Sequence, residues 1–276
     1  MGWHMGRLAP FDLETTSPDP EDARIVEAYI GRVGGGLDPI DPPGYLVNPG
    51  VEVPEEAAKV HGYTTEHLAE HGDPADTAVH AIAAWVADAI NEGIPLVGQN
   101  IRYDLTILDR ECRRHNLPTV EDRTGGELGP VIDTYVLSKY LDPWRKRVSA
   151  EQGAHVLKTT AQVFGVEWND EEAHGARYDA LIAARVAWCM GRHAHRPLPE
   201  RPRLAGRTDQ RHLFGALAVD LPTLHASQKR WAAEQAASFQ EWLRSPKAGE
   251  KRDPDAVVSG EWPLIPFSPA AEQVPA

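Results

Sequence analysis

The first fifty residues alternate between short apolar segments and polar turns, a pattern typical of β-strands. Residues 8–13, 24–33 and 44–48 each have the length and apolar content of one strand. Ile25 and Ile30 are among the apolar side chains of the second segment. Because the three segments follow one another so closely, the pattern predicts a sheet that begins with antiparallel strands.

Helical spacing appears after residue 54 and then alternates with strand-like segments. Residues 55–61 and 64–71 fit two short helices, and residues 76–91 predict a longer one with apolar side chains every three or four positions. Further elements are predicted as strands at 95–97 and 131–133 and as helices at 103–115, 152–164 and 177–192. Three strands followed by alternating helices and strands indicate an α/β fold, a mixed sheet flanked by helices.

The last third of the chain has a different organisation. Three prolines within residues 195–203 cannot continue a helix and predict a linker. We therefore divide the chain into a domain at 1–193, a linker at 194–220 and a C-terminal part at 221–276, consisting of an amphipathic helix and a flexible tail. The apolar stripe of that helix must be buried against the domain or against a partner such as a polymerase.

Composition narrows the function classes. The formal net charge of −13 argues against a protein that coats long nucleic acids through a broad basic surface, although it allows a narrow metal-assisted site. Cys112 and Cys189 form no close pair, so neither a disulfide framework nor a cysteine-based zinc site is indicated. No apolar segment approaches the roughly 18 residues of a membrane span, and we predict a cytoplasmic protein without a membrane partner.

Four acidic residues in three separated segments form the candidate chemistry. Asp12 and Glu14 are two residues apart at the end of the first strand, so their side chains point to the same face. Asp104 begins the helix after the fourth strand, and Asp179 lies early on the last helix of the domain. Carboxylates brought together in this way suit two Mg²⁺ or Mn²⁺ ions, which can promote phosphodiester hydrolysis. Each group also has a simpler interpretation, since a strand-end acidic pair is often solvated and Asp104 could cap its helix.

His174 is the candidate proton acceptor. It is five residues before Asp179, which corresponds to about 500° around a helix, so the two side chains cannot share one helical face. His174 must therefore precede the helix, where the neighbouring Gly175 allows backbone freedom. A histidine in that place could accept a proton from an attacking water, because its ordinary pKa is near neutrality. A surface histidine is the simpler alternative.

Taken together, these segments resemble the three ordered motifs of the DEDDh 3′–5′ exonucleases, the DnaQ-like group that includes the proofreading subunit of bacterial replicative polymerase. Residues 11–16 are similar to the first motif, 97–104 to the second and 174–180 to the third. The resemblance covers about residues 7–193. It implies a ribonuclease H-like fold with a five-stranded mixed sheet and, for this chain, a C-terminal helical extension.

The resemblance also implies individual roles. Asp12, Glu14 and Asp179 would bind the metal that carries the nucleophilic water, Asp12 and Asp104 would bind a second metal, and His174 would be the general base. By the same resemblance, Leu13 and the main chain of Thr15 and Thr16 would contact the terminal nucleotide, although a buried leucine beside two strand-end threonines is the simpler alternative. Asn100, Arg102 and Arg177 lie within the motifs and are further candidate substrate contacts. The chain differs from the family pattern at two places, and both bear on substrate choice. Gln99 stands where many relatives carry histidine, and residues 37–44 form an insertion.

A basic segment outside the motifs is a weaker candidate. Arg145, Lys146 and Arg147 follow Trp144 in a predicted loop, where they could hold a nucleic-acid backbone or simply face water. Trp144 could stack on a base or pack on the core.

These observations predict a metal-dependent 3′–5′ exonuclease that releases nucleoside 5′-monophosphates, with the 3′ end of single-stranded DNA favoured over RNA. One alternative is a proofreading subunit held to a separate polymerase by the C-terminal helix. Another is a 3′–5′ exoribonuclease, because the same metal chemistry cleaves either polymer. A non-catalytic binding module is disfavoured by the intact set of five catalytic side chains.

Overall fold

A twisted sheet built around one long central strand organises the computed structural model, which describes residues 2–204 and 209–268. Its strands are β1 (Arg7–Thr15), β2 (Ile25–Ile30), β3 (Val33–Gly34), β4 (Tyr45–Asn48), β5 (Asp73–Pro74), β6 (Leu96–Gly98) and β7 (Val131–Asp133). Their order is β5-β4-β2-β1-β6-β7, with β3 also paired to β1. β1 pairs antiparallel with β2 and parallel with β6, so the mixed sheet predicted from the sequence is confirmed.

The sheet has seven strands in the described residues, not the expected five. The additional strands, β3 and β5, contain two residues each. Two residues are too few to show the alternation of apolar and polar side chains by which strands are recognised. They pair with β1 and β4 and extend the sheet at those positions.

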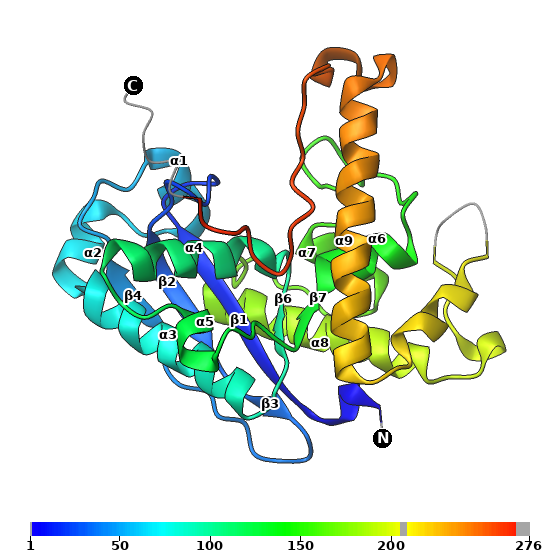
Figure 1. Cartoon of the computed structure of the whole chain (residues 1–276), viewed down its shortest axis with the longest axis horizontal. Helices are drawn as coiled ribbons and strands as arrows, with labels where there is room; N and C mark the ends of the chain where they lie inside the picture. The colour runs from blue at the N-terminus through cyan, green and yellow to red at the C-terminus, as the bar shows by residue number, and fades with distance from the viewer. Residues whose placement is uncertain (1, 205–208, 269–276) are drawn as a thin grey trace.

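Helices cover both faces of the sheet (Figure 1). They are α1 (Glu55–His61), α2 (Thr65–His71), α3 (Ala75–Asn91), α4 (Ile101–Arg114), α5 (Val120–Thr124), α6 (Thr134–Leu141), α7 (Leu157–Val163) and α8 (Ala176–Ala194). α3 and α4 pack against the sheet on one side, and α8 packs along β1 and β2 on the other. The side chains between these layers form one large apolar core.

Three differences from the predicted helices have local causes. α6 was not predicted, and it begins where the side chain of Asp133 accepts the backbone N–H of Tyr135 at 2.9 Å. α5 is a single short turn closed by a capping box between Thr119 and Asp122. α7 begins only at Leu157, because residues 149–153 form turns instead of helix.

The region predicted as a linker contains two short 3₁₀ helices, η2 (Leu198–Glu200) and η3 (Arg211–Leu217). Phe214 and Leu217 on η3 are fully buried in the same core as the sheet. A third 3₁₀ helix, η1 (Trp3–Met5), lies at the start of the chain, where the Trp3 indole donates to the carbonyl of Leu217 at 2.8 Å. The tail predicted to be flexible begins after residue 245, but its residues 246–268 are hydrogen-bonded to the domain through Trp262 and Ile265. The rest of it, from 269 onward, lies outside the described residues.

The long helix α9 (Leu221–Arg244) rises from the domain as a column (Figure 1). Its apolar face is buried on the domain at Leu224 and Trp231, and the Trp231 ring stacks on Tyr140 of α6 at a centroid distance of 3.8 Å. Docking on the domain, one of the two fates expected for this face, is therefore observed. After η4 (Pro246–Lys251), the chain returns beside α9 and crosses to α4, where the Ile265 N–H donates to Thr106.

α9 also completes the hydrogen bonding of β7, the edge strand of the sheet. The side chain of the fully buried Gln228 accepts the N–H of Asp133 at 2.7 Å and donates to the carbonyl of Val131 at 2.8 Å. His225 accepts the N–H of Val131 at 3.1 Å. These contacts occupy backbone groups that an open sheet edge leaves unpaired.

No helix in the described residues is long and apolar enough to cross a bilayer.

Replacing Gln228 with alanine should destabilise the whole domain. The substitution leaves a buried N–H and a buried carbonyl without partners, each costing about 1–3 kcal/mol. We expect the free energy of unfolding of Gln228→Ala to fall by about 2–4 kcal/mol in urea denaturation. The control is Arg230→Gln, an exposed position on the same helix. A Gln228→Ala protein as stable as this control would contradict the role assigned to α9.

Candidate active site

Asp12 and Glu14 are polar interruptions in an otherwise buried strand. Both are half-buried on β1, whereas Phe11 and Leu13 beside them are buried in the core. In the register of the sheet, Asp12 lies opposite Tyr29 and Glu14 lies opposite Glu27. The strand therefore directs two carboxylates to one face at its carboxyl end, as its alternation predicts.

Asp104 approaches this pair from the first turn of α4. It is 3% exposed, and its Oδ1 accepts the backbone N–H of Leu13 at 3.2 Å. The helix starts after Asn100, which has a φ of 61° and whose N–H donates to Asp133 at 2.9 Å. Asp104 is thus bonded to the first strand, and the residue that caps α4 is Asn100.

Asp179 approaches from the first turns of α8 on the opposite face of the sheet. Its Oδ1 is buried and has no hydrogen-bond partner in the described part of the protein. Burial raises the pKa of Asp179 to about 6, although the charge of His174 acts in the opposite direction. A buried carboxylate oxygen without a donor is costly, and a cation would satisfy it.

The electrostatic coupling of the acids shows that they converge. Burial raises the pKa of Asp12 well above its ordinary range, and the charges of Asp104, Glu14, Asp179 and Glu27 raise it further. The pKa of Glu14 rises to about 9, and that of Asp104 to about 8, chiefly because both side chains are buried. The other three predicted carboxylates are therefore close enough for their charges to oppose the ionisation of Asp12.

Glu27 is a fifth acid that the sequence analysis did not identify. It lies on β2 opposite Glu14, and its Oε2 accepts the backbone N–H of Ala176 at 3.0 Å. Ala176 is the first residue of α8, so Glu27 fixes the end of the helix that carries Asp179. The available signal was a lone charged residue between apolar neighbours in the strand at 25–30.

His174 lies before α8, as its spacing from Asp179 predicts. The side chain is exposed and the backbone has a φ of 65°, which non-glycine residues adopt uncommonly. Gly175 separates it from the helix as the N-cap residue. This position places an exposed imidazole close to the half-buried Asp179 and leaves it open to solvent.

A groove of about 580 Å³ adjoins the carboxylates. One wall is the end of β1, with Leu13, Glu14, Thr15 and Thr16, and the opposite wall is α1 with the exposed Val60. The Thr15 hydroxyl lies 2.6 Å from the Tyr103 hydroxyl, and the buried Thr16 accepts the N–H of Arg24 at 3.0 Å. The groove therefore contains three of the predicted substrate residues, while Tyr103 and α1 were not anticipated.

The two predicted arginines have partners within the protein. Arg177 forms an ion pair with Asp41 of the 37–44 insertion, with Nε and Oδ1 2.9 Å apart. Arg102 donates through one guanidinium nitrogen to the carbonyls of Ser259 at 2.9 Å and Glu261 at 3.2 Å. Neither lines the groove beside β1.

In the basic loop before α7, Arg145 and Arg147 bond to nearby groups of the protein itself. Arg145 is paired with the buried Asp142, with a nitrogen and an oxygen 3.1 Å apart, and Arg147 donates to carbonyls of the same loop. Trp144 is 77% exposed and does not pack on the core.

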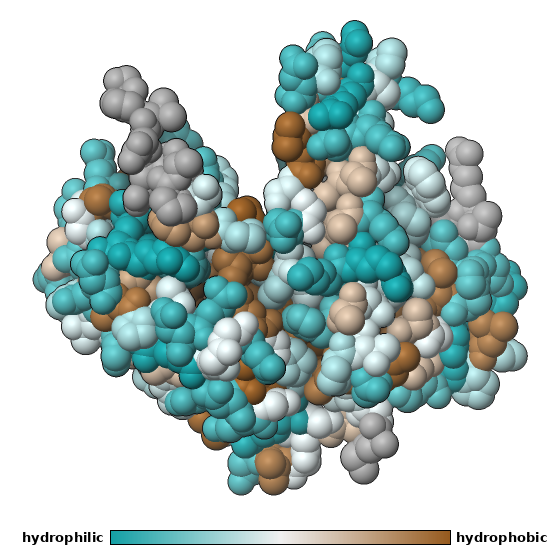
Figure 2. Space-filling model, in the orientation of Figure 1, coloured by the Kyte–Doolittle hydropathy of each residue, from teal (hydrophilic) through white to brown (hydrophobic). Residues whose placement is uncertain are grey.

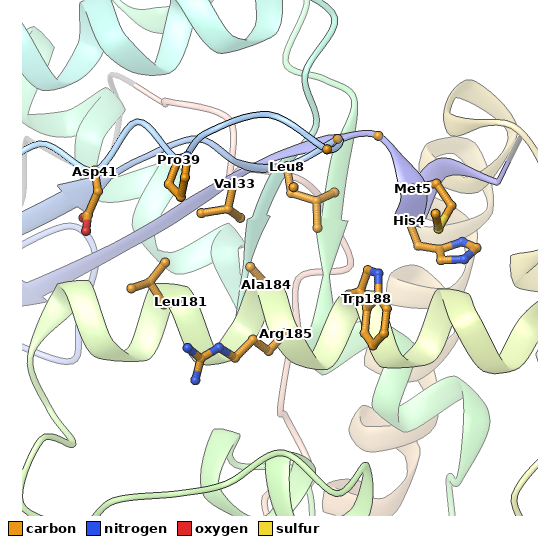
Figure 3. Close-up of a pocket in the computed structure, with 14 residues that line it drawn as sticks. His4, Met5, Leu8, Val33, Pro39, Asp41, Leu181, Ala184, Arg185 and Trp188 are labelled. Atoms are coloured by element: carbon orange, nitrogen blue, oxygen red, sulfur yellow. The ribbon is translucent and has the colours of Figure 1, made fainter.

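A second cavity, of about 520 Å³, lies between α8 and the beginning of β1 (Figure 3). Leu181, Ala184 and Trp188 line it from α8, while Leu8 and Val33 face them from the sheet. None of the five candidate catalytic residues lines this cavity. Glu14 lines the groove beside β1 instead, so this cavity is not part of the candidate site.

In residues 2–204 and 209–268, no three or more histidine, cysteine, aspartate or glutamate side chains are arranged so that they could hold a metal ion. The carboxylates nevertheless have the chemistry that divalent cations require. They are oxygen donors, they are crowded enough to raise their pKa values, and one buried oxygen lacks a donor.

Known exonucleases are similar to this chain over most of the domain. A family model described as an exonuclease, RNase_T, matches residues 10–187. The PolC-type DNA polymerase III of Lacticaseibacillus paracasei is 27% identical over 184 residues, which cover 67% of this chain and 11% of that protein. The DNA polymerase III subunit epsilon of Rickettsia conorii is 28% identical over 180 residues, covering 63% of this chain and 69% of that protein. The chain thus spans only about a tenth of its PolC-type relatives.

Solved structures show the same fold. E. coli exonuclease I in complex with a dT13 oligonucleotide aligns with a TM-score of 0.52 and 17% identity, over 66% of this chain and 40% of that one. Exonuclease I from Methylocaldum szegediense aligns with a TM-score of 0.52 and 22% identity, over 67% and 40% of the two chains. The ribonuclease H-like fold implied by the three motifs is confirmed.

The raised pKa of Asp104 predicts a specific pH dependence of stability. Because the folded protein holds this proton at pH values where the unfolded chain has lost it, the contribution of Asp104 to stability falls as pH rises from about 4 to 8. We compare the free energies of unfolding of Asp104→Asn and wild type without divalent metal. Between pH 5 and pH 8, the difference should shift in favour of Asp104→Asn by at least about 1.4 kcal/mol, the equivalent of one pKa unit. Asparagine keeps an acceptor for the Leu13 N–H.

Urea denaturation in EDTA at four pH values measures this difference. Asp88→Asn, at an exposed position on α3, is the control and should follow wild type. A constant difference between Asp104→Asn and wild type across the pH range would show that burial does not raise the pKa of Asp104 in the folded protein.

Proposed function

Because the chain belongs to the exonuclease family, as the match over residues 10–187 establishes, we propose that it is a metal-dependent 3′–5′ exonuclease. It would hydrolyse the terminal phosphodiester bond of single-stranded DNA and release nucleoside 5′-monophosphates. The observation that carries this proposal is the convergence of Asp104, Glu14 and Asp179 on Asp12. Such a cluster is costly unless cations occupy it.

Each of the five candidate catalytic residues has a proposed role. Asp12, Glu14 and Asp179 would hold one Mg²⁺ or Mn²⁺ ion, and Asp12 with Asp104 would hold a second. Two such ions supply activation of a water and stabilisation of the leaving oxygen. His174 accepts the proton of the attacking water, and its exposed position before α8 lets the proton pass on to solvent.

The groove beside β1 suits the 3′-terminal nucleotide. It is next to Glu14, and its walls combine the main chain of Leu13, Thr15 and Thr16 with apolar side chains of α1. Its volume of about 580 Å³ is within the usual range for small-molecule sites. Single-stranded DNA is the preferred polymer because the fold is shared with an exonuclease I solved with dT13.

The free-standing enzyme is preferred to a polymerase-bound subunit. Part of the apolar face of α9, the proposed polymerase anchor, is occupied at Leu224 and Trp231 by the chain's own domain, while Phe239 and Trp242 stay exposed. The epsilon-subunit relatives nevertheless keep the proofreading role as the second candidate. An exoribonuclease is the third, and it is distinguished by contacts to the 2′ position.

Loss of single catalytic side chains should stop the reaction without unfolding the protein. Asp12→Ala removes the ligand shared by both ions, so we expect no detectable turnover. His174→Ala should lower kcat by about 10²–10⁴-fold and flatten the pH dependence near neutrality, since general base catalysis contributes on that order. The assay follows 5′-labelled single-stranded DNA, duplex DNA and single-stranded RNA with Mg²⁺, Mn²⁺ or EDTA.

The exposed His212 on η3 provides the matched control, and His212→Ala should keep wild-type activity. A ladder that shortens from the 3′ end with metal, and is absent in EDTA, is the result expected of wild type. Hydrolysis at the wild-type rate by a folded Asp12→Ala protein would rule out the proposed site.

A further inference from the structure

Another groove lies beside the N-terminus of α4, the helix that also carries Asp104. It has a volume of about 210 Å³ and is enclosed by α6, α9 and the returning C-terminal segment. We call it the α6–α9 groove and define it by Arg102, Tyr135, Lys139, Gln235, Phe239 and Ser259. Asn100 and Arg102 belong to the same segment as Asp104, so the groove is connected to the catalytic cluster through α4.

The wall contributed by α9 lies beyond the exonuclease match, which ends at residue 187. Figure 1 shows the returning segment beside α9, and Figure 2 shows the surface notched where α9 rises from the sheet domain. The groove is therefore a feature of this chain's C-terminal extension.

Two positive charges face this groove. The nitrogen of Lys139 lies 5.1 Å from the centroid of the Tyr135 ring, and Arg102 is close enough to contribute to lowering the Lys139 pKa. Among the described residues, neither cation has an acidic side chain within 4.0 Å. The Arg102 partners are neutral carbonyls, which leave its charge uncompensated and several of its five donors free.

The one acid that lines the groove is already satisfied. Asp133 is 1% exposed, and its two oxygens accept hydrogen bonds from Asn100, Tyr135 and the indole of Trp262. Burial raises the pKa of Asp133. The groove is thus locally positive in a chain with a net charge of −13, which indicates an anionic ligand.

An aromatic pair stands on the α9 side of the groove. Phe239 and Trp242 are stacked, with ring centroids 5.7 Å apart and an interplanar angle of 15°. They remain 47% and 36% exposed, whereas the other tryptophan of α9, Trp231, is buried. Exposed aromatic rings beside uncompensated cations are the combination by which proteins bind single-stranded nucleic acid.

We propose that the α6–α9 groove binds the single strand on the 5′ side of the terminal nucleotide, with Arg102 and Lys139 on its phosphates and Phe239 under a base. The proposal rests on the proposed exonuclease function and extends it to a second contact with the substrate. At about 210 Å³, the groove is smaller than a typical small-molecule pocket. It holds part of the backbone while the base lies outside on the aromatic pair.

Binding to dT20, measured by fluorescence anisotropy with Ca²⁺ replacing Mg²⁺ to suppress hydrolysis, tests the groove directly. Phe239→Ala should weaken binding about 5- to 150-fold, the equivalent of one stacked base at about 1–3 kcal/mol. Lys139→Gln should reduce the slope of log affinity against log salt by about 0.7, because one phosphate contact is lost. Arg230→Gln, on the same helix but paired with Glu234, is the control and should match wild type.

Hydrolysis of a minimal substrate separates the groove from the catalytic site. The p-nitrophenyl ester of thymidine 5′-monophosphate has no upstream nucleotide, so Lys139→Gln and Phe239→Ala should cleave it at the wild-type rate. Both variants should lose kcat/KM on dT20.

Different results would contradict the proposed groove and the proposed exonuclease function. If both variants bound dT20 with the affinity and salt slope of wild type, the groove would not be a binding site for the strand. The same conclusion would follow if wild type did not bind dT20. Equal losses on the ester and on dT20 would overturn the proposed groove too, since the damage would then lie in the catalytic site. Failure of the wild-type protein to cleave any substrate would refute the proposed function, while the anisotropy measurement would still decide whether the groove binds DNA.

Discussion

The constraint on which the site depends is the repulsion between carboxylates gathered in a poorly solvated space. Asp12 lies at their centre, and burial together with four neighbouring acidic charges opposes its ionisation. The fold maintains this arrangement by fixing each segment separately. The Leu13 N–H bonds to Asp104 from β1, and Glu27 bonds to the first residue of α8 from β2. In the proposed function, bound cations would offset this repulsion and supply the positive charge that a reaction at a phosphate requires.

Much of the site could be predicted because its signals are local. Strand alternation places Asp12 and Glu14 on one face, and the angle between His174 and Asp179 excludes a shared helical face. Each statement needs only a few neighbouring residues, and the ordered motifs then relate the three segments to one another. The fold class followed in the same way from the alternation of strand-like and helical segments, as the mixed sheet confirms.

What could not be predicted depends on contacts between distant parts of the chain. Glu27 gains its role only because α8 begins beside it, 149 residues later in the sequence. The start of α6 depends on Asp133, which also contacts Trp262, 129 residues away. β3 and β5 are too short to have a pattern of their own. In the predicted linker, the burial of Phe214 and Leu217 likewise reflects tertiary packing rather than local sequence.

The C-terminal extension gives the acidic domain a surface of the opposite character. α9 is held to the edge strand β7 through Gln228 and to α6 through Trp231, so its position relative to α4 is fixed. This fixed position closes the groove around Arg102 and Lys139. In the proposed function, the N-terminal end of α4 would therefore carry both Asp104, a metal ligand, and Arg102, a contact to the single-stranded DNA.

The central claim is that the crowded carboxylates form a site for two divalent cations. Isothermal titration calorimetry with Mn²⁺ at pH 7, in two buffers of different ionisation enthalpy, tests it most directly. The account predicts two ions per chain in the presence of a nucleoside 5′-monophosphate, with protons released on binding because the pKa values of Glu14 and Asp104 lie at about 9 and 8 without metal. Absence of Mn²⁺ binding, or binding unchanged in Asp12→Asn, would contradict it.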